Sequence, residues 1–165
     1  PVPGFGLPTY DDIARLQVVD ATPYTANSDI TTVIPYDDTI PAITEGTEIL
    51  TATITPKHAS SIMKLEVTIP IISGTAAATQ ICASVHKSSQ SPAIAAAAIQ
   101  NHSSTNPVGF PPIYVSDTPG SVAPITYSVR IGQSASGTIR ANGTTTGRAF
   151  GGVSLCQLRI LEVRG

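Results

Sequence analysis

Hydrophobic and polar residues alternate along several short stretches of this chain. In the clearest stretch, residues 63–71, Met, Leu, Val and Ile occupy every second position between Lys, Glu, Thr and Pro. A period of two is the pattern of a β-strand that buries one face. The same pattern recurs at 50–55, 81–86 and 125–131. We predict a strand at each of these four stretches, with Leu65 facing the core and Glu66 facing outward.

The last apolar stretch, residues 153–163, has hydrophobic residues on both parities. A strand of this kind is central in its sheet or is covered by another subunit. Shorter strand candidates lie at 31–34, 94–99, 113–115 and 137–141. About eight or nine short strands separated by turn residues are typical of an antiparallel sandwich or jelly roll. The fold class predicted is therefore all-β, an antiparallel β-sandwich that is jelly-roll-like.

Turn residues and composition divide the chain further. Asn142-Gly143 predicts a type I′ hairpin turn, because both central positions of that turn need positive φ. Residues 72–75 and Pro119-Gly120 predict two other reversals. The first 23 residues are rich in proline and glycine and contain one candidate helical turn at 11–16. We interpret 1–23 as a connector and 24–165 as the sandwich domain.

The composition limits the partners of this chain. Charged residues make up 12% of the sequence, against roughly a quarter in an average soluble protein. A surface so poor in charge favours an obligate oligomer, whose subunits cover one another. The net charge of −2 and nine scattered Lys and Arg residues argue against nucleic-acid binding. No apolar run has the length of a membrane helix, so no membrane insertion is expected.

Two cysteines, Cys82 and Cys156, lie far apart within apolar stretches. Because free cysteine is among the most buried residue types, both are predicted to be buried thiols. A disulfide between them is the alternative.

The chain offers little catalytic chemistry. The paired carboxylates are Asp11-Asp12 and Asp37-Asp38, and the second pair lies between two prolines, as in a solvated turn. A calcium site there is the alternative, since hard cations need several clustered oxygens. His58, His86 and His102 lack the close spacing of metal ligands, so surface or rim positions are predicted. Without a nucleophile elbow, phosphate loop or CxxC motif, we expect no enzyme, no metal and no cofactor.

Several segments nevertheless resemble a known module. They are the stretch from Thr32-Val33-Ile34-Pro35-Tyr36-Asp37-Asp38 to Thr53-Ile54-Thr55-Pro56, Tyr127-Ser128-Val129-Arg130-Ile131-Gly132, Gly147-Arg148-Ala149-Phe150-Gly151-Gly152, and the ending Ile160-Leu161-Glu162-Val163. In order and position they resemble the C-terminal domain of bacteriophage tail-fibre and tailspike proteins. The resemblance implies a trimeric jelly-roll tip module, part of a longer chain made in the bacterial cytosol and located in the virion. It also implies trimerisation and recognition of a host cell-surface glycan or receptor.

A ligand site is expected in the longest irregular region, residues 100–121. This region carries His102, Asn106, Phe110 and Tyr114. Long loops on a β scaffold often bind ligands, and aromatic rings beside amides suit sugars. Alternatively, Phe110 and Tyr114 fill the sandwich or a subunit interface. The second functional hypothesis is a carbohydrate-processing domain, a glycan hydrolase whose acids assemble across subunits.

Overall fold

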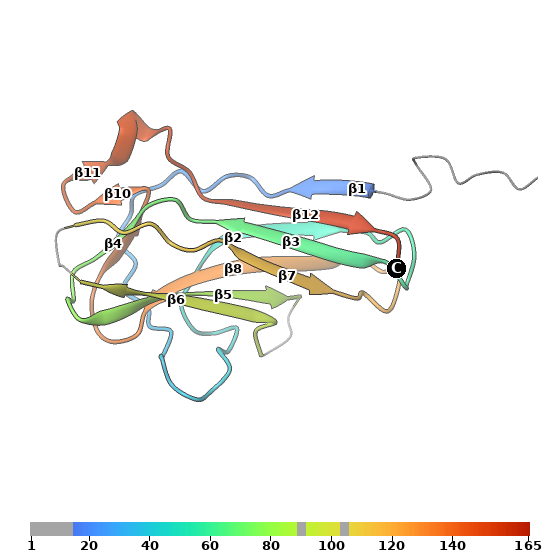
Figure 1. Ribbon diagram of the computed structural model, residues 1–165, viewed down its shortest axis with the longest axis horizontal. Coiled ribbons are helices and arrows are strands. Elements are labelled where there is room, and N and C mark those ends of the chain that lie inside the picture. Colours follow the sequence, from blue (N-terminus) through green and yellow to red (C-terminus); the bar gives the residue numbers. More distant parts are fainter. Residues whose placement is uncertain (1–14, 89–91, 103–105) are drawn as a thin grey trace, which may run out of the picture.

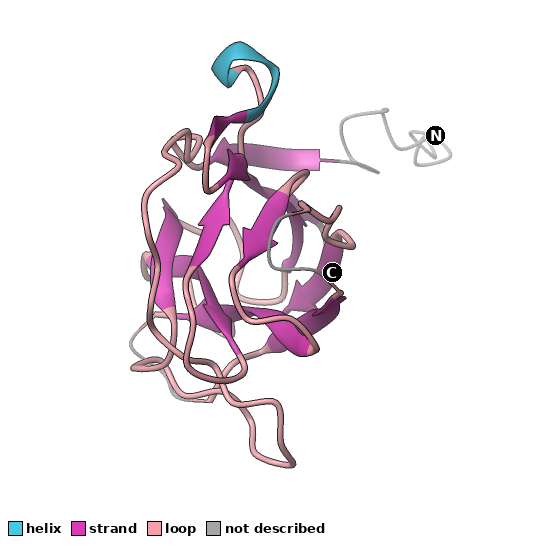
Figure 2. Ribbon diagram, turned by 90° about the vertical axis from the view of Figure 1, so that its left-hand side faces the viewer, coloured by secondary structure: helices cyan, strands magenta, loops and turns pink. Residues whose placement is uncertain are grey.

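The chain folds into two four-stranded antiparallel sheets that enclose one core (Figures 1 and 2). The computed structural model describes residues 15–88, 92–102 and 106–165. The first sheet has the order β1 (Arg15–Asp20), β12 (Gln157–Val163), β3 (Ile62–Thr68) and β7 (Ile113–Asp117). The second sheet has the order β2 (Thr47–Ile54), β8 (Ile125–Gln133), β5 (Thr79–Lys87) and β6 (Ala95–Asn101).

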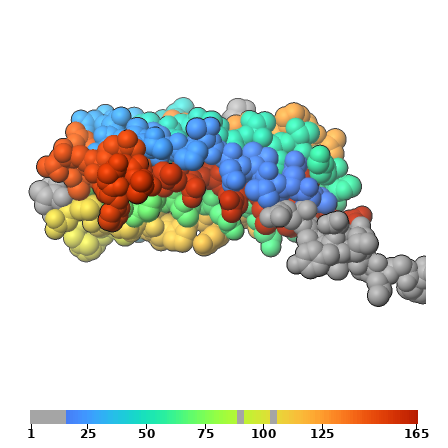
Figure 3. Space-filling model, turned by 90° about the horizontal axis from the view of Figure 1, so that it is seen from above, coloured from blue at the N-terminus to red at the C-terminus, as the bar shows by residue number. Residues whose placement is uncertain are grey.

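Except for the consecutive strands β5 and β6, neighbouring strands in the two sheets come from distant parts of the sequence, as in a jelly roll. β1 pairs with β12 although they lie at opposite ends of the described chain. Figure 3 shows these two segments, blue and red, side by side. The predicted all-β antiparallel sandwich is confirmed, and the last strand is central in its sheet, as its apolar pattern predicted.

The core lies between the inward faces of the two sheets. Leu65 is only 1% exposed, whereas its neighbour Glu66 is exposed, which confirms the predicted parity of β3. β12 contributes Leu158 and Ile160 from the first sheet, and the second sheet contributes the apolar positions of β2, β5 and β8. One polar link crosses this core, where the buried Tyr127 hydroxyl donates to Asp117 Oδ2 at 2.6 Å.

Four short strands lie at one end of the sandwich. β4 (Ile72–Gly74) pairs with β9 (Ile139–Ala141), and β10 (Gly143–Thr144) pairs with β11 (Gly147–Arg148). A 3₁₀ turn, η1 (Ala149–Gly152), follows β11 and leads toward β12. Residues 72–74, predicted to lie in a reversal, are therefore a strand, because β9 provides a pairing partner that is distant in sequence.

The N-terminal boundary predicted from composition is wrong. β1, which lies within the expected 1–23 connector, is a full member of the first sheet. Residues 11–14 of the expected helical turn lie outside the described residues, and Arg15 and Leu16 are extended in β1. Pairing with β12 decides the conformation here, since a local helical turn offers fewer hydrogen bonds than a complete strand pairing.

Asn142 does not form the predicted hairpin turn. It is fully buried with φ +64° between β9 and β10, and the β10–β11 reversal passes through Thr145 and Thr146 instead. The Asn142 amide donates to the carbonyls of Tyr24 and Ala26. The positive φ predicted by the Asn-Gly pair is present, but the residue fixes the segment after β1 in place of closing a hairpin.

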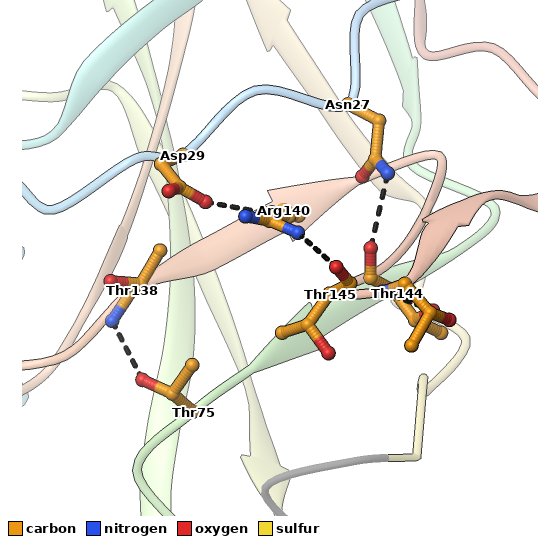
Figure 4. A network of polar contacts seen from close by, with 8 residues as sticks. Asn27, Asp29, Thr75, Thr138, Arg140, Thr144 and Thr145 are labelled. Atoms are coloured by element: carbon orange, nitrogen blue, oxygen red, sulfur yellow. Dashed lines mark hydrogen bonds and ion pairs between the residues drawn. The ribbon is translucent and has the colours of Figure 1, made fainter.

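A polar network fastens the same segment to the end of the sandwich (Figure 4). The Arg140 guanidinium on β9 donates to Asp29 and to the Thr145 carbonyl, and the Asn27 amide donates to the Thr144 carbonyl at 3.1 Å. Every partner is a side chain or carbonyl of this chain. The network therefore has a structural explanation and contains no unused catalytic group.

Both cysteines are free and buried, as predicted. Burial raises the pKa of Cys82 to about 11 and that of Cys156 to about 12. The Asn142 side chain opposes the second of these shifts by accepting a hydrogen bond from the Cys156 sulfur. Neither thiol is therefore ionised near neutral pH, which argues against a nucleophilic role.

Candidate interaction surface

The outward face of the first sheet presents an unusual mixture of side chains for an exposed surface. Strand pairing aligns two rows of residues across the face. One row crosses the sheet near its middle and the other lies one pleat away. The rows are Val18, Leu161, Lys64 and Ser116, and Asp20, Arg159, Glu66 and Tyr114. We call these eight residues the sheet face.

Charges of both signs lie at the centre of the sheet face. Arg159 Nε donates to Asp20 Oδ1 at 2.8 Å, and Glu66 lies opposite Arg159 in the register of β3. This arrangement places a carboxylate on each side of one guanidinium. An exposed pair of this kind contributes little to the stability of a single chain. It can nevertheless select a partner by complementary charge.

Apolar side chains surround these charges. Val18 and Leu161 are partly exposed, and with Glu66 and Arg159 they line a shallow hollow. Tyr114 is 69% exposed and lines a second hollow with Lys64 and Ser116. The face is therefore neither a charged solvated surface nor a closed pocket. It carries Arg and Tyr, two residue types that are enriched in protein–protein interfaces.

The η1 turn extends the apolar surface at one end of β12. Phe150 and Val153 are 75% and 77% exposed, and with Pro70, Ile71 and Leu155 they line an open apolar hollow. Phe150 has φ +49°, a conformation uncommon for a bulky residue. Figure 2 shows this turn projecting from the body of the sandwich. We call Phe150 and Val153 the apolar tip.

Part of the outward face of the second sheet is covered by its own chain, whereas Thr51 and Thr53 of β2 remain exposed. Residues 31–46, which we call the strap, cross this face between β1 and β2. Ile34 N donates to the Gln133 carbonyl at 3.1 Å, and Arg130 donates to the carbonyls of Glu45 and Gly46. At Gly132 a Cβ would lie 2.8 Å from the Thr32 carbonyl, so this close crossing needs glycine.

The strap buries His86, which the sequence predicted at the surface or rim. His86 points outward on β5, as its parity predicted, but it is 0% exposed. Its Nε2 lies 3.0 Å from Ser84 Oγ, while Nδ1 has no partner among the described residues. Burial, together with the charge of Arg130, lowers the pKa of His86 below its usual value, although Glu45 and Glu48 oppose the shift.

This burial gives a testable dependence on pH. The unfolded chain binds a proton at His86 below about pH 6.5, whereas the folded chain resists it, so stability should fall with decreasing pH. The slope should reach at most about 1.4 kcal/mol for each pH unit, until the lowered pKa is passed. Urea unfolding of wild type and His86→Gln at several pH values between neutral and mildly acidic measures this slope. We expect His86→Gln to flatten it.

His58→Gln is the matched control, because His58 is exposed. Its slope should remain that of the wild type. If the unfolding free energies of wild type and His86→Gln depend equally on pH, then the strap does not hinder protonation of His86.

The sequence-predicted ligand residues do not form one site. Phe110 is buried in the core, which agrees with the alternative that it fills the sandwich. His102 and Asn106 are exposed, and Tyr114 lies on β7 as part of the sheet face. Aromatic character identified Phe110 and Tyr114 as notable, but only the topology separates a core residue from a surface residue. Phe150 and Val153 were missed as site residues because neighbouring glycines favoured a structural explanation.

The acidic and histidine side chains that the sequence analysis considered for metal binding are dispersed in the part of the chain that the structure describes. No group of three or more His, Cys, Asp or Glu side chains is placed to hold a metal there. Asp37 accepts hydrogen bonds from the backbone and hydroxyl of Thr39 within an exposed turn, as the solvated-turn prediction requires. Among the same residues, no helix is long and apolar enough to cross a membrane.

Comparison with known proteins corrects the resemblance drawn from the sequence. The search of curated proteins finds no match. The family model of the Pgp3 C-terminal domain, a domain of a Chlamydia virulence protein, matches residues 27–165. The assignments to a bacteriophage tail fibre or tailspike, to a virion location, to host-glycan recognition in that role and to a glycan hydrolase are therefore wrong.

The physical reason for the error lies in the motifs themselves. Alternating short strands separated by turn residues are features that β-sandwiches and jelly rolls of many families share. They report the architecture and not the family. The match over residues 27–165 covers most of the sandwich, and the chain belongs to the family of the Pgp3 C-terminal domain.

Proposed function

We propose that this chain is a non-enzymatic assembly domain that forms a homotrimer through the sheet face and the apolar tip. The observation that carries the proposal is the sheet face itself, where Arg159 lies between two carboxylates and beside partly exposed aliphatic residues. A charge-poor chain gains little from leaving such a face in water. Its membership of a family named for a virulence protein's domain supports a role in assembling a virulence-associated protein.

The position of the apolar tip is compatible with a ring of three subunits. Phe150 and Val153 lie at one end of the molecule and are separate from the centre of the sheet face. Contact between a tip and a different patch on the neighbour is head-to-tail, and such contacts form rings. Three is the smallest ring that a head-to-tail contact closes. In a twofold dimer the same contact would be made twice, from each tip to the face of the partner, so the solution mass decides between the two assemblies.

Solution mass tests this proposal. Three chains of 17.0 kDa give a particle of about 51 kDa. Light scattering at micromolar concentration should report this mass for the wild type. Arg159→Glu would place three carboxylates together at the centre of the face, so we expect a folded monomer. Far-UV circular dichroism should show that the variant keeps its β-structure.

Thr51→Glu is the matched control. Thr51 is exposed on the outward face of β2, in the other sheet, so the same added charge should leave the trimer intact. A monomeric or dimeric wild type would overturn the proposal. A trimeric Arg159→Glu variant would remove the sheet face from the interface.

A further inference from the structure

The strand β6 has a free edge that lacks the usual protection. It is the last strand of the second sheet, so one of its sides has no strand partner in the described chain. Natural edge strands carry charges, prolines or bulges that discourage pairing with another chain. β1 and β2 each have an irregular register, and β7 carries Asp117. β6, with the sequence AAAAIQN, has neither a charge nor a register shift.

An apolar groove lies beside this edge. It has a volume of about 230 Å³ and is enclosed between the strap and the outward side of β5 and β6. Ala96, Ala97 and Ala98 form its β6 wall, and Cys82 contributes from β5. Tyr36, which is 67% exposed, belongs to the opposite wall. The small side chains of β6 leave room for a larger side chain from a partner.

The strap adds negative charge to the groove. Asp37 lines it, and Asp38 follows in the same exposed turn. Hydrogen bonds from the side chain and N–H of Thr39 lower the pKa of Asp37, so its carboxylate stays charged. None of the ion pairs between described residues includes either aspartate. A basic partner residue would therefore find an unpaired negative charge here.

We propose that β6 binds an extended segment of another protein as an additional strand. The segment's backbone pairs with the free edge, one apolar side chain enters the groove, and a Lys or Arg lies beside Asp37 and Asp38. Backbone pairing supplies affinity in this recognition mode, and the pocket beside the strand supplies specificity. The site lies on the second sheet, at an edge that is next to β7, and binding of another protein there goes beyond the assembly function.

Synthetic peptides test this directly. The probes are fluorescein-labelled peptides of about nine residues, a typical strand length, with alternating Val and Thr and a Lys at each end. Their central residue is Val, Leu or Phe. Fluorescence anisotropy, measured as the unmodified protein is added to each peptide, should give a Kd below about 1 mM for at least one peptide. Two N-methylated versions of each peptide carry their methyl groups on the two alternate sets of amides. The version methylated on the amides that face β6 should not bind, whereas the other version should bind as the unmodified peptide does.

Variants locate the peptide on β6. Ala98→Lys places a long cation in the groove and should weaken binding at least about tenfold, since it removes both space and charge complementarity. Asp37→Asn with Asp38→Asn should weaken binding about threefold and reduce its dependence on salt. Gln100→Lys adds the same charge on the same side of β6 but outside the groove. It should change the Kd less than about twofold.

Three outcomes would overturn the proposal. The first is that no peptide of the panel binds. The second is that the two N-methylated versions of a peptide bind equally well. The third is that Ala98→Lys and Gln100→Lys weaken binding equally. The N-methylation test uses the unmodified protein, so it holds even if a variant fails to fold. Light scattering also gives the molar mass of each variant, so a loss of peptide binding is distinguishable from a loss of assembly.

Discussion

Replacing Leu65 with Asp is expected to prevent the domain from folding, whereas Glu66→Ala should leave the fold intact. Leu65 is 1% exposed between β12 and β7, so a carboxylate there would be buried without a partner. The loss of packing and the burial of a charge should together cost more than about 4 kcal/mol. That cost is a large share of the roughly 5–15 kcal/mol by which a typical domain is stable.

Glu66 points away from the core, so its truncation should change the unfolding free energy by no more than about 0.5 kcal/mol. Urea denaturation followed by circular dichroism gives both values. Because Glu66 belongs to the sheet face, its replacement can also weaken assembly. Such an effect would vary with protein concentration, whereas the effect of Leu65→Asp would not. Similar unfolding midpoints for the two variants at every concentration would contradict the parity of β3.

Glu162→Ala is expected to be the most damaging replacement of a charged residue in the described chain. Glu162 faces inward on β12 and is 0% exposed. Its Oε2 accepts from the Gln17 amide at 2.5 Å, and its Oε1 accepts from the Lys57 N–H at 2.7 Å. One carboxylate thus ties β1 and the connection between β2 and β3 to the last strand. Removing it takes away the acceptor of the Lys57 N–H and one of the two acceptors of the Gln17 amide, which also donates to the Thr55 carbonyl. Losing two hydrogen bonds to a charged group should cost about 3 kcal/mol.

The same residue should make the domain sensitive to acid. Burial alone would raise the pKa of Glu162, but hydrogen bonds, including those from Gln17 and Lys57, hold the pKa below its usual value. Its stabilising contribution is therefore complete above about pH 4.5 and is lost as the pH falls through the lowered pKa. Glu162→Gln keeps the shape of the side chain without the titration. Its unfolding free energy should fall less steeply below about pH 4.5 than that of the wild type.

Gln157→Ala is a suitable control, because Gln157 is an exposed residue of the same strand. It should unfold in acid as the wild type does. If Glu162→Gln and the wild type lose stability in parallel, the carboxylate is not the acid-sensitive group.

The two large effects have a common origin in the position of β12. This strand lies between β1 and β3, so it joins two segments that are both far from it in the sequence. Damage there separates segments that no local interaction holds together. The outward face of the same strand carries Arg159 and Leu161, which the proposed trimer would bury. One strand thus connects the stability of the domain with its assembly.

Local pattern in the sequence was sufficient for the strands and their parity. Alternation places one side of each strand toward apolar neighbours whatever the order of strands in the sheet. Leu65 and Glu66 therefore follow from the sequence alone, whereas the burial of both cysteines was predicted from the residue type. Short apolar runs also predicted β6 and β7, although not the partners that make them edge strands. The family did not follow from pattern, because motifs required by the fold are shared by unrelated jelly rolls.

Tertiary structure decided everything that depends on what covers an outward-facing residue. His86 and Arg159 are both outward-facing polar residues on strands. The strap buries His86 on the second sheet, whereas Arg159 on the first sheet is exposed. In the sequence, Glu162 is one more polar residue near the end of the chain, and Asn142 has the pattern of a turn residue. Their burial depends on contacts with residues more than a hundred positions away in the sequence. A periodic pattern records which side of a strand a residue faces, but only the long-range path of the chain determines whether that side meets water.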